Sequence, residues 1–272
     1  MKIKRLALVA GGGELPLVFL KQAVKNNLDV FVIEIEGEEN PGLKNFKFER
    51  IKVKLAALSG MIKETAARSI KYVMFLGYVR PINLLKDIIF DEITRKTLLN
   101  LKDKRPKALM DSSIAQFKKA GITAVPTTYL MDEILAPEGF INTISPEIEI
   151  IESMRMYAKI AREIAALEVG QTIVAGSGMI WAVEAMEGTD NCIKRGGAMA
   201  KKGFMVIKMA RPKQDFRYDV PAIGLRTLKL IKSLGGRGIV VEAGKTFLLN
   251  KDELKRYADN NNLFIYGWRN NK

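Results

Sequence analysis

The feature that most constrains this fold is a triple glycine between a short apolar segment and a helical one. Residues 4–10 end in the apolar run Leu6–Ala10, which is typical of a buried strand, and Gly11–Gly13 follow it directly. Residues 15–26 then have helical periodicity, with Pro16 well placed in a first turn. This order predicts the first unit of an α/β fold that binds a nucleotide or a phosphate, although a plain tight turn has the same pattern.

Strand and helix patterns alternate through the first half of the chain. Strands are expected at residues 29–35, 48–53, 71–76 and 122–125, and helices at residues 58–70, 80–101 and 112–120, with a charged break at 102–107. This alternation predicts a parallel sheet with helices on its faces. We therefore assign residues 1–130 to a Rossmann-like domain that binds the nucleotide or substrate.

The second half has a different order of elements. Residues 131–145 contain proline and glycine without a strong period, which predicts a linker between domains. A helix is expected from a cap at Ser145 to about Leu167, and two strands around Gly176–Gly178 form a hairpin signature. Further helices are expected at 189–201, 222–234 and 251–260, and further strands at 204–209, 238–242, 246–249 and 263–266. This order predicts a mixed α/β catalytic domain over residues 146–272.

The absence of histidine excludes several classes of enzyme. The 272 residues include no histidine and one cysteine, Cys192, so Ser-His and Cys-His mechanisms and His-ligated zinc sites are excluded. A single cysteine cannot form an intramolecular disulfide, which fits a reducing cytoplasm. Catalysis must rest on carboxylates, lysine, arginine, hydroxyl groups or a metal held by oxygen, for which magnesium, manganese or calcium are suited.

The net charge of +14 favours an anionic ligand or an anionic membrane surface. The basic residues are spread along the chain and mixed with acids, and no aromatic-basic motif is present, so nucleic acid is not expected as a partner. No apolar run reaches the roughly 18 residues of a transmembrane helix, and Leu6–Ala10 is too short for a signal peptide. We therefore expect a cytoplasmic protein.

Two strand ends in the first domain are candidate substrate-binding sites. A glycine turn at Gly12 and Gly13 lets backbone N–H groups approach an anion at a helix N-terminus. Gly77 follows a later strand, and Arg80 is expected at the carboxyl edge of the sheet, where a guanidinium can clamp phosphate. A surface arginine ahead of a helix-starting proline is the alternative interpretation of Arg80.

Two acidic segments in the second domain are candidate metal sites. Residues 184–190 hold three carboxylates and a threonine, which suit a cation with oxygen ligands, although a capped helix with solvated acids has the same composition. In residues 214–221, a locally extended chain would project Asp215, Arg217 and Asp219 on one side. Two carboxylates beside a cation suit magnesium and phosphate; the alternative is a surface ion-pair ladder.

The chain resembles the two-domain UDP-2,3-diacylglucosamine pyrophosphatases of lipid A biosynthesis, which are distinct from the calcineurin-like enzymes. The matching stretches are residues 12–16, 167–171, 183–190, 208–224 and 241–244. The segments EGTD, QDFRYDVPAIG and VEAG in this order and spacing are more specific together than any one alone. The resemblance covers nearly the full length of the chain.

The resemblance implies hydrolysis of UDP-2,3-diacylglucosamine to UMP and 2,3-diacylglucosamine 1-phosphate (lipid X), with Mg²⁺ or Mn²⁺. The resemblance implies an essential Asp219, with roles for Glu187, Thr189, Asp190, Gln214, Asp215 and Arg217. We assign catalysis to Asp219, Arg217 and Lys208; metal ligation to Asp219, Asp215, Glu187 and Asp190; and substrate binding to Gly12, Gly13, Leu15, Gln171, Thr189 and Gln214, besides Gly77 and Arg80. In this mechanism a positioned water attacks phosphorus while the metal and cationic side chains neutralise the pyrophosphate.

The implied partner is a UDP-linked, acylated glucosamine. Its acyl chains need an apolar surface, for which the methionines between residues 154 and 209 are candidates, although methionines more often fill a core. Peripheral contact with the cytoplasmic face of the inner membrane and a homodimer are compatible with the sequence. The alternative function is a non-catalytic sensor of a nucleotide or dinucleotide, with which the glycine turn is also compatible.

Overall fold

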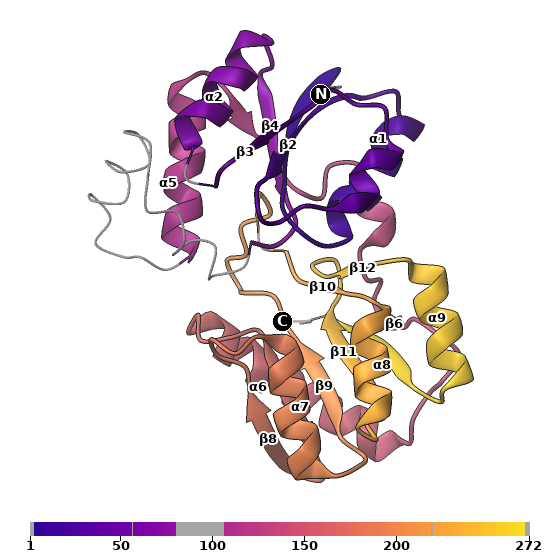
Figure 1. The fold of residues 1–272 in the computed structure, drawn as a ribbon. Helices are drawn as coiled ribbons and strands as arrows, with labels where there is room; N and C mark the ends of the chain where they lie inside the picture. Colours follow the sequence, from indigo (N-terminus) through magenta and orange to yellow (C-terminus); the bar gives the residue numbers. More distant parts are fainter. Residues whose placement is uncertain (1–2, 56, 80–105, 219, 270–272) are drawn as a thin grey trace. The chain divides into compact units, whose positions relative to one another are not determined.

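The computed structural model describes residues 3–55, 57–79, 106–218 and 220–269, and the chain divides into two compact units (Figure 1). Unit 1 comprises residues 1–131 and 216–218, and unit 2 comprises residues 132–215 and 219–272. Each unit has a sheet of its own. Arg80, Asp219 and the helix expected at residues 80–101 lie outside the described residues.

Unit 1 is built on a five-stranded parallel sheet in the order β3-β2-β1-β4-β5. Its elements in chain order are β1 (Arg5–Ala10), α1 (Leu15–Lys25), β2 (Asp29–Ile35), η1 (Pro41–Asn45), β3 (Arg50–Val53), α2 (Leu58–Ala67), β4 (Tyr72–Leu76), α5 (Pro106–Lys119) and β5 (Thr123–Ala124). Helix α1 covers one face of the sheet, and α2 and α5 cover the other (Figure 1). The predicted Rossmann-like parallel sheet is confirmed.

The central strands of this sheet are apolar along most of their length and do not alternate between apolar and polar residues. Every residue of Leu6–Ala10 and of Val30–Ile35 is buried, because helices cover both faces of β1 and β2. Parallel strands that are buried on both faces read as unbroken apolar runs. Helix α5 begins at Pro106, inside the expected break, because proline is tolerated in the first turn of a helix.

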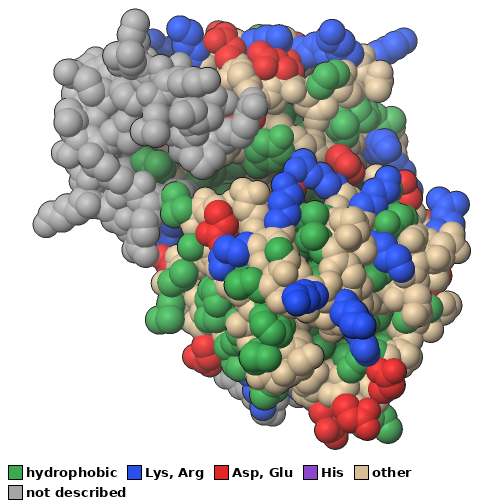
Figure 2. Space-filling model, turned by 60° about the horizontal axis from the view of Figure 1, so that its bottom comes forward, with side chains coloured by type: hydrophobic (Ala, Val, Ile, Leu, Met, Phe, Trp, Pro, Cys, Tyr) green, Lys and Arg blue, Asp and Glu red, His purple; other side chains and the backbone are tan. Residues whose placement is uncertain are grey.

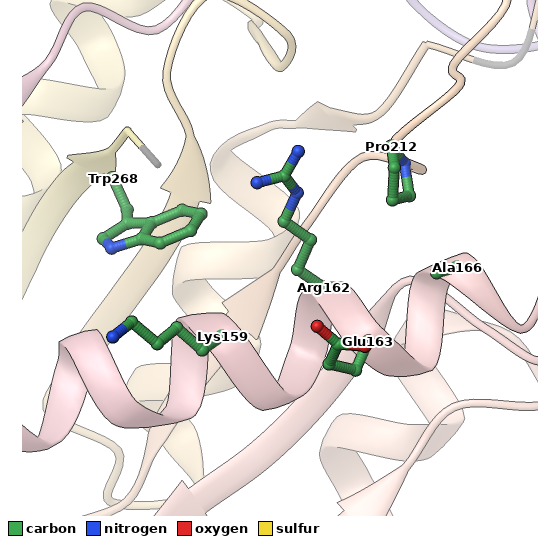
Figure 3. Close-up of a pocket in the computed structure, with 6 residues that line it drawn as sticks. All are labelled: Lys159, Arg162, Glu163, Ala166, Pro212 and Trp268. Atoms are coloured by element: carbon green, nitrogen blue, oxygen red, sulfur yellow. The ribbon is translucent and has the colours of Figure 1, made fainter. Parts of the chain in front are cut away.

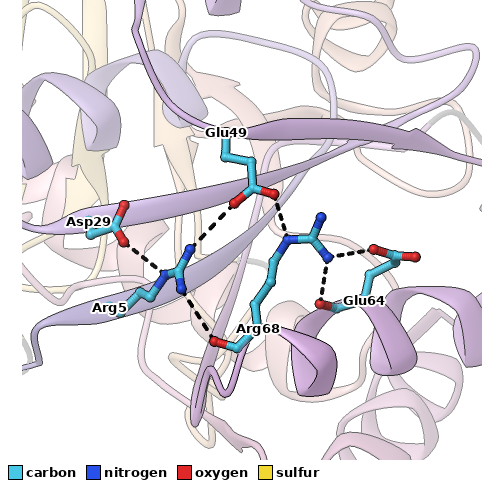
Figure 4. Close-up of polar contacts among 5 residues, drawn as sticks. All are labelled: Arg5, Asp29, Glu49, Glu64 and Arg68. Atoms are coloured by element: carbon cyan, nitrogen blue, oxygen red, sulfur yellow. Dashed lines mark hydrogen bonds and ion pairs between the residues drawn. The ribbon is translucent and has the colours of Figure 1, made fainter.

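An ion-pair cluster lies at the amino ends of the strands of unit 1 (Figure 4). Arg5 Nε is 2.8 Å from Asp29 Oδ2, and Arg68 Nε donates to Glu49 at 2.8 Å. Hydrogen bonds to Glu49 and Glu64 raise the pKa of Arg68, and its guanidinium lies 4.1 Å from the centre of the Phe31 ring. Exposed ion pairs of this kind contribute little to stability. The cluster is at the edge opposite the glycine turn, so we assign it a structural role.

Unit 2 is built on a six-stranded mixed sheet in the order β6-β13-β11-β9-β7-β8, with a separate two-stranded pair of β10 and β12. Its elements are η2 (Asp132–Ile134), β6 (Gly139–Phe140), α6 (Ile148–Ala166), β7 (Thr172–Gly176), β8 (Met179–Val183), α7 (Thr189–Ala200), β9 (Met205–Lys208), β10 (Ala222–Ile223), α8 (Leu225–Ser233), β11 (Gly238–Glu242), β12 (Phe247–Leu248), α9 (Lys251–Asn260) and β13 (Phe264–Trp268). Strands β9, β11 and β13 are parallel, and β6, β7 and β8 pair antiparallel. The predicted mixed α/β domain is confirmed.

Helices cover both faces of this second sheet. Met154, Tyr157 and Ala161 of α6 pack on one face, and residues of α7, α8 and α9 pack on the other. Within the described parts of the chain, no helix is both long and apolar enough to cross a membrane.

Three local expectations are wrong. Helix α6 begins at Ile148 with Glu147 as its cap, whereas Ser145 was the predicted cap. The helix expected from residue 222 begins at Leu225, because residues 222 and 223 pair with β12 instead. The chain turns at residues 216–218, so Asp215 and Arg217 do not lie on one side of an extended strand.

Candidate active site

The three parallel strands of unit 2 end in large functional side chains at one edge of the sheet. Lys208 ends β9, Glu242 ends β11 and Trp268 ends β13. Open α/β sheets bind ligands outside the carboxyl ends of their strands. Lys208 is only 9% exposed and Glu242 only 3%, and an unpaired buried charge costs on the order of several kcal/mol. This carboxyl edge is therefore the candidate active site.

Lys208 starts a chain of hydrogen bonds that reaches two other elements. Its Nζ lies 2.8 Å from the Thr189 hydroxyl at the start of α7 and 3.5 Å from the Thr172 hydroxyl at the start of β7. Thr189 donates to Glu184 Oε1 at 2.9 Å, and Glu184 Oε2 accepts from the Gln171 amide at 3.3 Å. Because an ammonium only donates and a carboxylate only accepts, the Thr189 hydroxyl accepts from Lys208 and donates to Glu184.

Gly170 makes this arrangement sterically feasible. A Cβ added at Gly170 would lie 2.0 Å from the Glu184 carbonyl oxygen, so only glycine allows the chain before β7 to approach the end of β8. Gln171, Thr189 and Lys208 were predicted site residues, and hydrogen bonds through Glu184 and the Thr189 hydroxyl bring these three together. Thr172 was not predicted, because its only signal was a hydroxyl at the first position of a strand.

Glu242 fixes the segment that follows β9. Its Oε2 accepts from the Ala210 amide at 3.1 Å, and its Oε1 accepts from Lys245 Nζ at 2.7 Å. The Arg211 amide donates to Gln214 Oε1 at 3.2 Å, so the Gln214 side chain bonds to its own segment. Glu242 therefore acts on the site by positioning residues 209–215.

Two of the predicted metal ligands are bonded to arginines. Glu187 forms an ion pair with Arg195, and this hydrogen bond is the main cause that lowers the pKa of Glu187. Asp190 Oδ2 lies 2.7 Å from Arg226 Nη2. Within the described ranges, no group of three or more acidic, cysteine or histidine side chains is placed to hold a metal ion. The acidic residues that the structure describes do not by themselves form a cation site, and Asp219 is not among the described residues.

Arg217 belongs to unit 1 and contacts Asp111 of α5 in the same unit. Its Nη2 lies 3.8 Å from Asp111 Oδ1, and the neighbouring Tyr218 hydroxyl donates to the same oxygen at 2.7 Å. The Phe216 carbonyl accepts from the Thr127 amide at 2.6 Å, which ties this turn to the end of the unit 1 sheet. Asp111 was not among the predicted site residues, because a single acid inside a helix carries no motif.

The glycine turn of unit 1 lies against the end of β4. Gly12 and Tyr78 form an isolated bridge, with the Gly12 amide donating to the Tyr78 carbonyl at 2.8 Å and the Tyr78 amide donating back at 3.0 Å. A Cβ on Gly12 would lie 2.9 Å from a Tyr78 ring carbon, and one on Gly77 would lie 2.6 Å from the Gly12 carbonyl oxygen. These glycines are therefore required for close approach of two loops.

The same turn occupies the position where this topology binds ligands. The strand order changes direction between β1 and β4, and nucleotides bind at such a switch point. Gly12, Gly13, Leu15 and Gly77 all lie there. The Gly12 amide is already bonded to Tyr78, so it is the shape of the turn, rather than this N–H group, that would meet a ligand.

Cys192 is not a nucleophile at neutral pH. The thiol is buried on α7, and burial is the main cause that raises its pKa to about 12. A thiol of this pKa stays protonated near pH 7. The Cys192 sulfur lies 4.0 Å from the carbonyl oxygen of Thr172, whose hydroxyl contacts Lys208. Cys192 is therefore a packing residue next to the hydrogen bonds that hold Lys208.

The comparison with protein families matches both halves of the chain. The model described as the LpxI N-terminal domain matches residues 5–134, and the LpxI C-terminal domain matches residues 137–266. A curated relative, the UDP-2,3-diacylglucosamine pyrophosphatase LpxI of Caulobacter vibrioides (strain ATCC 19089 / CIP 103742 / CB 15), is 28% identical over 277 residues. That alignment covers 97% of this chain and 98% of the relative.

Solved structures are only distantly similar. The biotin carboxylase domain of Hydrogenobacter thermophilus 2-oxoglutarate carboxylase is 11% identical with a TM-score of 0.29, and the match spans 66% of this chain but 36% of that one. An isoflavone reductase is 7% identical with a TM-score of 0.30 over 99% of this chain and 80% of that one. Similarity at this level supports no conclusion about function.

Proposed function

The chain belongs to the LpxI family, and on this premise we propose that it hydrolyses the pyrophosphate bond of UDP-2,3-diacylglucosamine. The products are UMP and 2,3-diacylglucosamine 1-phosphate. The observation that carries the proposal is the match, over 97% of this chain, to a relative named for that reaction. The chain contains no histidine, so in this proposal the hydrolysis rests on other side chains.

Lys208 is the residue best placed to act on the pyrophosphate. Its ammonium is buried at a sheet edge, where a positive charge interacts more strongly with a phosphate than it would in water. In this proposal Lys208 offsets the negative charge that develops on phosphate oxygens in the transition state. Thr189 and Thr172 accept from Lys208 and hold its ammonium in place, and Glu184 orients the Thr189 hydroxyl.

We also propose Mg²⁺ or Mn²⁺ as the cofactor. Asp219, Asp215, Glu187 and Asp190 are the candidate ligands, and the structure bonds Glu187 and Asp190 each to an arginine. A divalent ion would neutralise the pyrophosphate and lower the pKa of an attacking water. If this is correct, Mg²⁺ raises the melting temperature of the wild-type protein and not that of Asp219→Ala, whereas equal shifts in both proteins would place the ion elsewhere.

The acylated substrate suggests peripheral contact with the cytoplasmic face of a membrane. Met156, Met179, Met186 and Met199 are exposed, with Met186 at 87%, while Met154, Met205 and Met209 are buried in the core. Hydrophobic and basic side chains are interspersed on the face shown in Figure 2, as suits an anionic lipid surface. Sedimentation with vesicles of anionic and of neutral lipid tests this contact, which requires stronger binding to the anionic ones.

The activity is tested with UDP-2,3-diacylglucosamine and Mg²⁺ by following UMP release. We expect turnover by the wild-type protein and none by Asp219→Ala, with unchanged circular dichroism. Asp252→Ala, which removes an exposed acid at the start of α9, is the matched control and should turn over normally. Turnover by Asp219→Ala at the wild-type rate would remove Asp219 from the mechanism. Stabilisation by NAD without any UMP release would favour the sensor.

A further inference from the structure

A pocket opens at the carboxyl edge of the second sheet, on the face covered by α6 (Figure 3). The hydrogen bonds of Lys208 lie on the other face, at the start of α7. The pocket has a volume of about 260 Å³ and is lined by Lys159, Arg162, Glu163 and Ala166 of α6, Pro212 of the segment after β9, and Trp268 at the end of β13. Lys208 bonds to α7, whereas Trp268 packs with α6. The pocket is therefore distinct from the chain of residues that holds Lys208.

The charges in the pocket favour an anion. Lys159 and Arg162 are three residues apart on α6, so both lie on one side of the helix, and Glu163 is the one acid in the lining. No hydrogen bond or ion pair joins the side chain of Lys159 or Arg162 to another residue that the structure describes. The Arg162 side chain rises from α6 between Trp268 and Pro212 (Figure 3). A planar guanidinium in this position suits two hydrogen bonds to a phosphate.

The walls of the pocket are held in place by the rest of unit 2. Trp268 is only 5% exposed, so packing against α6 fixes its ring. Trp268 is in register with Glu242, whose carboxylate accepts from the Ala210 amide and so anchors the segment that carries Pro212. A site whose walls are already ordered loses less entropy when it binds a ligand.

The size of the pocket limits what it can hold. Pockets for complete drug-sized ligands usually measure about 300–1,000 Å³, so 260 Å³ suits one phosphate and one compact ring. Two cations in the lining disfavour an acyl chain. We propose that this pocket binds a phosphate carried on a compact ring, the chemistry that the two products of the proposed reaction share. The identity of the ring rests on the proposed function, but the anion site itself does not.

The two tryptophans of the chain provide a direct test. In the full-length variant Trp181→Phe, Trp268 is the single remaining tryptophan, and its fluorescence reports ligand binding. This protein is titrated with UMP, uridine, glucosamine 1-phosphate, glucosamine and inorganic phosphate. We expect a fluorescence change with UMP or glucosamine 1-phosphate at concentrations where uridine, glucosamine and inorganic phosphate give none. The more tightly bound of the two identifies the ring.

Arg162→Gln in the same background should weaken this binding at least tenfold, and Arg162→Lys should weaken it less. Arg155→Gln is the matched control, because Arg155 is an exposed arginine on the same helix that does not line the pocket. Binding that is equally strong for inorganic phosphate, or equally weakened by Arg155→Gln, would overturn the proposal. Circular dichroism of each variant excludes unfolding as the cause.

The same proteins separate this proposal from the proposed function. If Trp181→Phe releases UMP from UDP-2,3-diacylglucosamine but shows no binding that depends on Arg162, the pocket proposal fails and the enzymatic function stands. If UMP binds through Arg162 but no protein hydrolyses the substrate, the enzymatic function fails and the anion site stands.

Discussion

The carboxyl edges of the two sheets are built from different groups. In unit 1 the edge between β1 and β4 is formed by backbone, with Gly12 and Tyr78 exchanging two hydrogen bonds. In unit 2 the edge carries buried ionic side chains, Lys208 and Glu242, each bonded to polar groups of neighbouring elements. The glycine turn between β1 and β4 supplies shape, whereas Lys208 and Glu242 place buried charges at the second edge. If the proposed function is correct, this difference predicts that Lys208 at the second edge acts on the charge of the substrate, whereas the glycine turn of the first edge acts through its shape.

The largest expected effect comes from removing the charge at the second edge. Lys208→Met keeps most of the aliphatic stem but deletes the ammonium, so transition-state charge is no longer offset. We expect UMP release to fall by about 100-fold or more. Lys229→Met, at an exposed position on α8, should leave turnover unchanged. If Lys208→Met turns over normally, the ionic edge is structural and the comparison between the two edges fails.

The next largest effect is expected at the glycine turn between β1 and β4, where a substitution should change the free energy of unfolding. A Cβ at Gly11 would lie 2.5 Å from the Tyr78 carbonyl oxygen, so Gly11→Ala should destabilise the protein by about 1–3 kcal/mol. Gly60→Ala is the matched change, because Gly60 lies in α2 and an added Cβ meets only Ala57 at 3.8 Å. It should stabilise the protein by about 0.5–1 kcal/mol. Urea denaturation measures both, and equal effects would show that the β1–β4 approach is not tight.

A smaller effect is expected at the residue that links Lys208 to Glu184. Thr189→Val keeps the shape but removes the hydroxyl that accepts from Lys208 and donates to Glu184. UMP release should fall about tenfold, equivalent to roughly 1.4 kcal/mol in the barrier. Thr189→Ser retains the hydroxyl and should restore most of the activity. Loss of activity in both variants alike would assign Thr189 a packing role.

The smallest expected effect is on the rate at which the thiol of Cys192 is alkylated. Because burial raises the pKa of Cys192 to about 12, its thiolate fraction at pH 8 is about one in ten thousand. Iodoacetamide should therefore leave the native protein unmodified at pH 8 and label it after unfolding in urea. Rapid labelling of the native protein would mean that α7 does not pack closely against β7.

Strands and helices were predictable where the periodicity of apolar residues within one segment was sufficient to define them. Strand β2 spans Asp29–Ile35 and helix α9 spans Lys251–Asn260, as their periodicities predicted. Strand β10 was missed because two residues carry no period, and its partner β12 lies about 25 residues further along the chain. The turn at residues 216–218 was missed because it depends on bonds to residues of unit 1 that are distant in the chain, such as Thr127, and these three residues belong to that unit.

The candidate site was predictable residue by residue but not as an arrangement. Lys208, Thr189 and Gln171 were selected from matching segments, yet nothing local shows that one hydroxyl connects Lys208 to Glu184. Glu187 and Asp190 were predicted to bind a metal, and that prediction stays untested because the structure pairs each with an arginine and does not describe Asp219.

The sequence by itself determined the alternation of strands and helices, the family, and an enzyme without histidine, because periodicity, motifs and composition are local properties. Only the tertiary structure decided that the amide of Gly12 is used by Tyr78 and that Lys208 lies against Thr189. It also showed that Arg162 and Trp268 line one pocket. Hydrogen bonds and pockets join residues that are distant in the chain, so their partners exist only once strands and helices have packed.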